Sequence, residues 1–297
     1  MYQNLLGSAS NQFGFKNRHG TDMCVFSLKQ VIEFYNGLGS PVYVGFLDAS
    51  KAFDRLHHWK LFDKLIKRGL PAIILRLFVY WYQEQTFIIR WGDTLSDAFC
   101  GSNGVRQGGI ISPVFFNVYM DELSMQLNSS KYGCSINGES FNNLLYADDT
   151  CIIASSPDGL QKLLKICEEY AIDNAIAFNE SKTKCICFKP KSLKNLRVPA
   201  VFLNNVPLKF TSSIKYLGVF ISHDLSDDHD MERHKKYLYC KGNLIVTRFR
   251  HCSENVKVKL FKTYCYSTFG AQLWTRGGTR GEYSIVLVLV FICDFDI

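Results

Sequence analysis

The sequence of 297 residues lacks the features that mark secreted and membrane proteins. Its start, MYQNLLGSASNQFGF, has no charged segment followed by an apolar core, so we expect no secretory signal. The most apolar run, residues 285–293, is far too short to cross a bilayer as a helix. Internal repeats and low-complexity tracts are also missing. With 47% hydrophobic and 21% charged residues the composition is that of a globular protein, which we expect to be intracellular and free of membranes.

The eleven cysteines form neither a CxxC pair nor a regular frame. An odd number of cysteines without a secretory signal predicts reduced thiols, most of them buried as small hydrophobes. Residues of metal-binding type lie close together at His229, His234, Cys240, His251 and Cys252. Their spacing fits no zinc pattern, so we favour ordinary side chains over a zinc knuckle.

The net charge of +7 is unevenly distributed along the chain. Residues 1–150 carry 13 basic and 13 acidic side chains, whereas residues 151–297 carry 21 and 14. A neutral first half and a basic second half suit a catalytic body with an appendage that grips a polyanion. A solvated lysine-rich face would explain the charge equally well, so the charge alone does not decide between them.

Apolar periodicity and turn residues predict an α+β body followed by a basic helical segment. The expected strands are 42–47, 86–91, 94–100, 143–146, 150–154, 176–178, 184–188, 201–203 and 215–221. The expected helices are 59–68, 73–83, 114–127, a helix after 157, 231–250 and 255–274.

Two Ser-Pro pairs, at 112–113 and 156–157, predict helix starts with serine as the N-cap and proline as the first helical residue. After the second pair, one buried helical face is expected from the apolar spacing of Leu160, Leu163, Leu164, Cys167 and Ala171.

Three aspartates stand where apolar strands end or turn. Asp48 follows the strand at 42–47, and Asp148 and Asp149 lie at the turn between the strands at 143–146 and 150–154. Carboxylates brought by separate strands to one sheet edge can bind two Mg²⁺ ions and promote an in-line phosphoryl displacement. Neighbouring side chains in a strand point opposite ways, so we expect Asp48 and Asp148 to be essential and Asp149 auxiliary. An isolated Asp-Asp pair is most often a plain turn, so this pattern needs support from other motifs.

That support comes from five motifs in order that resemble those of reverse transcriptases from non-LTR, LINE-type retrotransposons, in a jockey-like form. They are FLDASKAFD at 46–54, GVRQGGIISPVFFNVYMD at 104–121, YADD at 146–149, NESKTK at 179–184 and YLG at 216–218. The segments QFGFK at 12–16 and GTD at 20–22 also resemble the fingers of these enzymes. The resemblance covers about residues 5–275 and implies a right-hand polymerase. Its antiparallel palm sheet would be packed on helices.

The resemblance also implies roles for single residues around the nucleotide. Phe53 takes the place of the bulky side chain under the sugar, where a ring would exclude a ribose 2′-hydroxyl. Gln107 and Gly108 match the positions that approach the base pair, and Arg106 would meet a phosphate or form a surface salt bridge. Lys16 and Arg18 match cations of the fingers that contact triphosphate.

Two further sites follow from the later motifs. Lys182 matches the family's lysine that would protonate or neutralise the pyrophosphate leaving group, with Lys184 as the alternative. Tyr216, Leu217 and Gly218 match the tight turn that holds the primer end. Each of these residues taken alone is also explained as an ordinary strand or surface residue.

From these motifs we expect fingers and palm over 1–222, a partial helical thumb over 223–275 and an atypical tail over 276–297. The expected reaction is attack of a primer 3′-hydroxyl on a dNTP, templated by RNA, with two Mg²⁺ ions as cofactor or Mn²⁺ in their place. The partners are then an RNA template, a DNA primer and dNTPs, and an endonuclease would have to come from a missing domain or another protein. The family implies a ribonucleoprotein in nucleus and cytoplasm.

Three other functions are compatible with parts of the sequence. A catalytically silent remnant that only binds RNA and DNA is favoured by the atypical tail and opposed by the intact motif residues. An RNA replicase would usually have a polar residue at Phe53 and glycine in place of Ala147. A group II intron maturase resembles the chain more than an RNA replicase does, but the sequence of residues 46–54 matches retrotransposon enzymes better.

Overall fold

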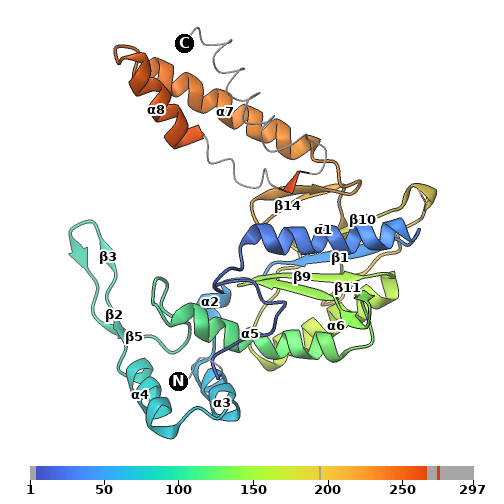
Figure 1. Cartoon of the computed structure of the whole chain (residues 1–297). Helices are drawn as coiled ribbons and strands as arrows, with labels where there is room; N and C mark the ends of the chain where they lie inside the picture. Colours follow the sequence, from blue (N-terminus) through green and yellow to red (C-terminus); the bar gives the residue numbers. More distant parts are fainter. Residues whose placement is uncertain (1–4, 194, 266–272, 275–297) are drawn as a thin grey trace. The chain divides into compact units, whose positions relative to one another are not determined.

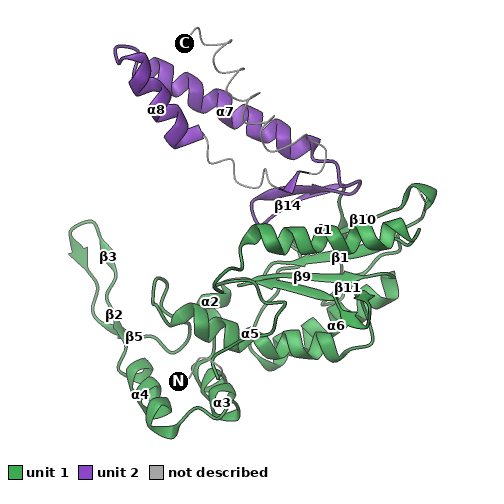
Figure 2. Ribbon diagram, viewed as in Figure 1, with its two compact units in different colours: residues 1–211 green, residues 212–297 purple. Residues whose placement is uncertain are grey.

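The computed structural model describes residues 5–193, 195–265 and 273–274 of the chain. Internal contacts divide the chain into two compact units, residues 1–211 and 212–297 (Figure 2). The sequence placed the boundary of the helical segment at 222. The contacts instead group the hairpin at 213–222 with the helices that follow it.

A five-stranded sheet forms the centre of the first unit. Its strands are β1 (Val42–Leu47), β8 (Asn143–Tyr146), β9 (Asp149–Ala154), β10 (Lys184–Phe188) and β13 (Lys209–Phe210), in the order β13-β10-β1-β9-β8. The neighbours in this order pair antiparallel, except that β13 runs parallel to β10 at one edge. Every residue of β1 is buried, as its uninterrupted apolar run predicted.

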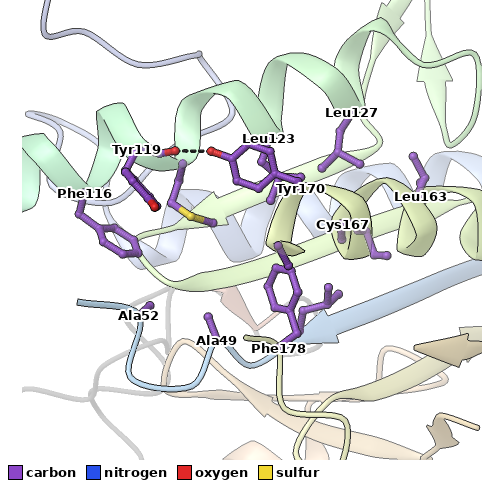
Figure 3. Close-up of a cluster of buried hydrophobic side chains, with 14 of the residues drawn as sticks. Ala49, Ala52, Phe116, Tyr119, Leu123, Leu127, Leu163, Cys167, Tyr170 and Phe178 are labelled. Atoms are coloured by element: carbon purple, nitrogen blue, oxygen red, sulfur yellow. Dashed lines mark hydrogen bonds between the residues drawn. The ribbon is translucent and has the colours of Figure 1, made fainter. Parts of the chain in front are cut away.

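Helices cover both faces of this sheet (Figure 1). Helix α1 (Thr21–Gly37) contacts β1 and β8 on one side, and α5 (Ser112–Ser129) and α6 (Pro157–Asp173) lie on the other. The predicted apolar face of α6 is confirmed, because all five of its expected core residues are buried. Figure 3 shows side chains of α5 and α6 packed in one buried cluster. Within it the Tyr170 hydroxyl donates to the carbonyl oxygen of Tyr119.

The rest of the first unit surrounds the sheet. It contains the helices α2 (Ala52–Arg55), α3 (His58–Lys67) and α4 (Ala72–Gln83), the 3₁₀ turn η1 (Lys191–Leu193) and short strands. Of these strands, β2 (Thr86–Phe87) pairs with β5 (Phe99–Cys100), and β3 (Arg90–Trp91) pairs with β4 (Thr94–Leu95). This confirms the hairpin predicted around residues 92–93. Two more hairpins join β6 (Ser135–Ile136) to β7 (Glu139–Ser140) and β11 (Phe202–Leu203) to β12 (Val206–Pro207).

In its described residues the second unit contains a hairpin and two helices. Strands β14 (Ser213–Tyr216) and β15 (Val219–Ser222) pair antiparallel, so the single strand predicted at 215–221 is wrong. The positive φ angles of Leu217 and Gly218 make the two-residue turn that reverses the chain there. Helices α7 (Asp228–Arg248) and α8 (Glu254–Cys265) confirm the predicted helical segment. The expected extension of the last helix toward 274 and the tail at 276–297 lie outside the described residues, apart from 273–274.

Two other local predictions are wrong. The first helical residue of α5 is Ser112 itself and Ile111 occupies the N-cap, without a side-chain hydrogen bond, whereas Ser156 does cap α6 by accepting from the Gly159 N–H. The expected strand at 176–178 is reduced to one bridge between Phe178 and Ala49.

The described cysteines are all free, and seven of the ten are buried, as the odd count predicted. No described group of three or more His, Cys, Asp or Glu side chains is arranged to hold a metal ion unaided. Within the residues covered by the structure, no helix is both long and apolar enough for a membrane span.

Candidate active site

Three carboxylates meet at one edge of the central sheet because of its strand order. Strand β1 ends at Leu47, directly before Asp48, and the neighbouring strand β9 begins at Asp149. The two strands pair with Leu47 opposite Thr150. Continuing this register by one residue places Asp48 across from Asp149. Asp48 and Asp149, which are 101 positions apart in the sequence, are thereby brought together, as the motifs predicted.

The turn between β8 and β9 separates the two adjacent aspartates. Tyr146 pairs with Asp149, so Ala147 and Asp148 form the two-residue turn and Asp149 is the first residue of β9. Ala147 has a φ of 56°, which non-glycine residues seldom adopt. Asp148 is half-buried and Asp149 is exposed. The two side chains therefore start from different backbone environments.

The three carboxylates influence one another electrostatically. Desolvation by the surrounding protein raises the pKa of Asp149 to about 6, and the negative charges of Asp148 and Asp48 add to the increase. The pKa of Asp148 is raised as well, first by desolvation and further by Asp48. An arrangement in which like charges oppose each other's ionisation is stabilised by a cation.

Lys182 joins this group from the loop before β10. Its ammonium nitrogen lies 3.7 Å from the Oδ2 of Asp48. The loop is held against the end of β1, because the Asn179 N–H donates to the Asp48 carbonyl at 2.8 Å and the Thr183 hydroxyl accepts from the Asp48 N–H at 3.3 Å. The Asn179 side chain in turn accepts from the Lys182 N–H at 3.2 Å. Asn179 and Thr183 thus fix the position of Lys182. Both lie in the NESKTK motif at 179–184, but the motif did not assign them this role.

Phe53 lies in the α2 turn that follows Asp48 and Ala49. Its ring stacks on Phe116 of α5, with ring centres 4.3 Å apart and an angle of 11°, and the edge of Phe15 meets it at 6.2 Å. The side chain is half-buried, with the core below it. Phe53 is therefore a rigid ring on a partly open surface rather than a fully enclosed core residue.

The loop before α5 carries Arg106, Gln107 and Gly108, and all three are exposed. The Gln107 amide donates to Asp54 Oδ1 at 3.3 Å, Gly108 has a φ of 81°, and the Arg106 guanidinium stacks over Trp81 at 5.8 Å. The salt bridge considered for Arg106 is replaced by this cation–π contact. A pocket of about 600 Å³ opens beside the loop, lined by Asp54, Gln85, Thr86, Phe87, Ile88, Asn103, Gly104, Val105, Arg106 and Gln107.

The two cations expected in the fingers occupy different surroundings. Lys16 donates to the carbonyl oxygens of Ser8 and Ala9, and burial lowers its pKa, with the charge of Asp121 acting in the opposite direction. Its ammonium group thus holds the N-terminal segment. Arg18 is exposed, with a φ of 60°.

The turn formed by Tyr216, Leu217 and Gly218 belongs to the second unit. Arg233 of α7 donates to the Gly218 carbonyl at 3.0 Å and is itself held by Asp230 at 2.8 Å. Asp230 is fully buried and also accepts from the Phe220 N–H and the Trp274 indole, both at 3.1 Å. The sequence motif identified the turn, but the buried carboxylate that secures it to α7 was not predicted.

The donor set at the sheet edge fits a hard divalent cation, since it offers three carboxylates and no sulfur or imidazole. The described residues hold no ready-made cage of three ligands. Mg²⁺ in phosphoryl-transfer sites commonly takes one or two carboxylates and completes its shell with water and substrate phosphates. The residues present therefore fit such an ion without enclosing it.

Comparison with known proteins agrees with the motifs. The sequence profile described as "Reverse transcriptase (RNA-dependent DNA polymerase)" matches residues 5–221. The chain is 28% identical over 278 residues to the probable RNA-directed DNA polymerase from transposon X-element of Drosophila melanogaster, covering 89% of this chain and 29% of that protein. It is 26% identical over 267 residues to the RNA-directed DNA polymerase from mobile element jockey of Drosophila funebris, covering 84% and 28%. The chain thus spans less than a third of the length of these relatives.

Solved structures show a likeness of fold alone. Apo telomerase from Candida tropicalis superposes with a TM-score of 0.54 at 14% identity, over 98% of this chain and 52% of that one. The same enzyme in complex with a fragment of telomeric RNA gives 0.52 at 13% identity, over 94% and 46%. The expected α+β polymerase fold is supported at this coarse level. From the profile match and these relatives, the chain belongs to the reverse transcriptase family, and its predicted resemblance to the enzymes of non-LTR retrotransposons is confirmed.

Proposed function

We propose that this chain adds deoxynucleotides to a primer 3′-hydroxyl on an RNA template. The observation that carries the proposal is the meeting of Asp48, Asp148 and Asp149 at one sheet edge, with Lys182 against Asp48, in a reverse transcriptase family member. In the reaction the 3′-oxygen attacks the α-phosphorus, the bond from that phosphorus to the bridging oxygen breaks, and pyrophosphate leaves.

Asp48, Asp148 and Asp149 would hold two Mg²⁺ ions, or Mn²⁺ in their place. Such ions supply charge neutralisation at the phosphates and lower the pKa of the attacking hydroxyl. The carboxylates themselves position the reactants at the end of β1 and β9. In support, the pKa values of Asp148 and Asp149 are raised, first by desolvation and then by the neighbouring carboxylates, and a bound cation would offset both effects.

Lys182 would act at the leaving group. Its side chain is 66% exposed, so the ammonium can turn from Asp48 toward a pyrophosphate without breaking a buried contact. The Nζ proton would pass to the leaving oxygen, or the positive charge would stabilise it in place. Either route makes Lys182 a contributor to the chemical step.

The residues around Phe53 would select and orient the nucleotide. The Phe53 ring, backed by Phe116, would exclude a 2′-hydroxyl, since that group would lose its hydrogen bonds against an apolar surface. Gln107, Gly108 and Arg106 would contact the nascent base pair and template. Lys16 and Arg18 would contribute positive charge near the fingers, with Lys16 acting through the segment it holds.

We assign residues 1–222 to fingers and palm and 223–275 to a partial thumb in this proposal, with the Tyr216–Gly218 turn as primer grip. The partners would be an RNA template, a DNA primer and dNTPs, and the nick that supplies a primer would come from another domain or protein. Nuclear and cytoplasmic ribonucleoprotein particles are the proposed location.

Primer extension tests the proposal directly. Purified chain is given poly(rA)–oligo(dT), dTTP and Mg²⁺ beside an Asp148→Ala variant. We expect extension that the variant loses by at least about a hundredfold, because a carboxylate of the metal site is removed. Duplex binding without extension by the wild-type chain would overturn the proposal and support a silent nucleic-acid-binding remnant.

A further inference from the structure

We propose that Gln12 is a positioning residue of the polymerase centre, whose buried amide oxygen fixes the backbone of the turn that carries Asp148. This inference rests on the proposed function, because it concerns the geometry of the same carboxylates. It extends the site to a segment that precedes the first catalytic aspartate by 36 residues in the sequence.

The contacts of Gln12 are specific to the catalytic turn. Its Oε1 accepts a hydrogen bond from the Ala147 N–H at 3.2 Å and another from the Gly14 N–H at 2.8 Å. Gln12 is 1% exposed. A buried glutamine therefore links two backbone segments that are 133 residues apart, and one of them is the turn between β8 and β9.

The segment around Gln12 lies along β8 like an additional short strand. The Phe13 N–H donates to the Leu145 carbonyl at 2.7 Å, and the Leu145 N–H donates to the Asn11 carbonyl at 2.8 Å. Gln12 and Leu145 form a parallel bridge. This pairing ends directly beside the turn, so the side chain of Gln12 reaches Ala147 from a fixed base.

Gly14 completes the approach. A Cβ atom at Gly14 would lie 2.4 Å from the Ala147 nitrogen, which real structures do not tolerate. Asn117 of α5 holds the Gly14 carbonyl at 2.8 Å from the other side. Only a glycine permits this close contact of backbone with backbone.

The backbone of Ala147 needs stabilising contacts from outside the turn. Its φ of 56° is unfavourable for a residue with a Cβ atom, and such conformations persist only where the surroundings over-determine them. Ala147 is buried, so its N–H requires an acceptor within the protein. Gln12 supplies that acceptor, and Asp148 follows in the chain.

The nitrogen of the Gln12 side-chain amide argues against a role in packing alone. The Nε2 of Gln12 is buried and has no hydrogen-bond partner among the described residues. A side chain selected only for packing stability would not leave a buried donor unsatisfied. Its retention is explained if the position of the oxygen matters for the turn.

The experiment compares three variants of the full chain with the wild type. Gln12→Met keeps the length of the side chain but removes the acceptor, and Gln12→Glu keeps an acceptor oxygen. Asn128→Ala is the matched control, because Asn128 accepts from Asn11 at 3.1 Å in the same segment but does not touch the turn. Direct Mn²⁺ binding, kcat and KM in primer extension, and Tm are measured for each.

We expect Gln12→Met to weaken Mn²⁺ binding by about tenfold, the loss typical of residues that orient metal ligands, and to lower kcat with little change in KM. Gln12→Glu should keep an affinity near that of the wild type. Unchanged Mn²⁺ affinity and kcat in Gln12→Met would overturn the inference. So would an equal loss of affinity in an Asn128→Ala variant of the same Tm, since the effect would then follow stability.

Two further measurements keep the result unambiguous. If Gln12→Met does not fold, Gln12→Asn replaces it, because the shorter side chain keeps the amide and withdraws its oxygen from Ala147. Asp148→Asn separates the two proposals. Wild-type Mn²⁺ binding and extension in Asp148→Asn would remove the proposed function together with this inference, whereas an inactive Asp148→Asn beside a wild-type-like Gln12→Met would remove the inference alone.

Discussion

The ammonium nitrogen of Lys182 lies 3.7 Å from the Oδ2 of Asp48, although 134 residues separate them in the sequence. Pairing of β10 with β1 produces this relationship, since Phe46 lies opposite Lys184 and the loop before β10 passes the end of β1. The contact joins a proposed metal ligand to the proposed leaving-group cation.

Replacing Lys182 with glutamine should slow the chemical step. We expect Lys182→Gln to lower kcat roughly a hundredfold, in the range observed for loss of a general acid, with KM for dTTP changed much less. Single-turnover primer extension measures the step. Lys184→Gln is the control, since Lys184 is exposed at the start of β10. A larger defect in the control would transfer the role to Lys184.

Phe53→Val should admit ribonucleotides. Loss of the ring removes the wall stacked on Phe116, so we expect the ratio of kcat/KM for dGTP over GTP to fall by about tenfold or more. Incorporation opposite a template cytosine measures both substrates. Phe15→Leu is the control because it removes only the ring that makes a T-shaped contact with Phe53. An unchanged ratio in Phe53→Val would show that Phe53 is a packing residue.

Asp230 should make the second unit sensitive to acid. Burial by itself would raise the pKa of Asp230, but hydrogen bonds from His234, the Phe220 N–H, Trp274 and Arg233 hold that pKa well below its usual range. A lowered folded-state pKa contributes stability that is present above the unfolded value of about 4 and is lost as pH falls below it. Urea unfolding between pH 3 and pH 7, followed by tryptophan fluorescence, checks this direction.

Asp230→Asn should remove most of that pH dependence and lower the free energy of unfolding by about 2 kcal/mol, because the half-buried Arg233 loses its charged hydrogen-bond partner. Asp228→Asn serves as the comparison, since Asp228 is exposed two residues earlier and its carboxylate accepts from the Ser226 hydroxyl at 2.7 Å. Equal effects of the two substitutions would mean that the buried network around Asp230 does not stabilise the unit.

Exposed lysines of α7 should contribute to duplex binding through charge alone. We expect Lys235→Gln to reduce the slope of log Kd against log salt by about 1, with similar effects for any duplex sequence. Fluorescence anisotropy of an RNA–DNA hybrid at several salt concentrations provides the slope. Lys165→Gln, an exposed lysine of α6 whose ammonium lies 4.0 Å from Glu169, is the control. An unaltered slope for Lys235→Gln would exclude α7 from the phosphate contacts at that position.

Local sequence was sufficient for the elements whose signals are short-range. The apolar run of β1, the Ser156-Pro157 start of α6 and the spacing of its buried face were all predicted, because strand burial, N-capping and helical periodicity depend on residues a few positions apart. The three aspartates were also identified from strand ends and motif order. These features needed no knowledge of the packing.

Contacts between distant segments determined the rest. The motif indicated a turn at Tyr216–Gly218, but only the pairing of β14 with β15 showed that this turn divides the strand expected at 215–221 into a hairpin. Gln12 and Asp230 became recognisable only when burial and partners were known, since an isolated glutamine or aspartate reads as a surface residue. The protein interior strengthens such hydrogen bonds and penalises unpaired polar groups, and that environment exists only once the chain has folded.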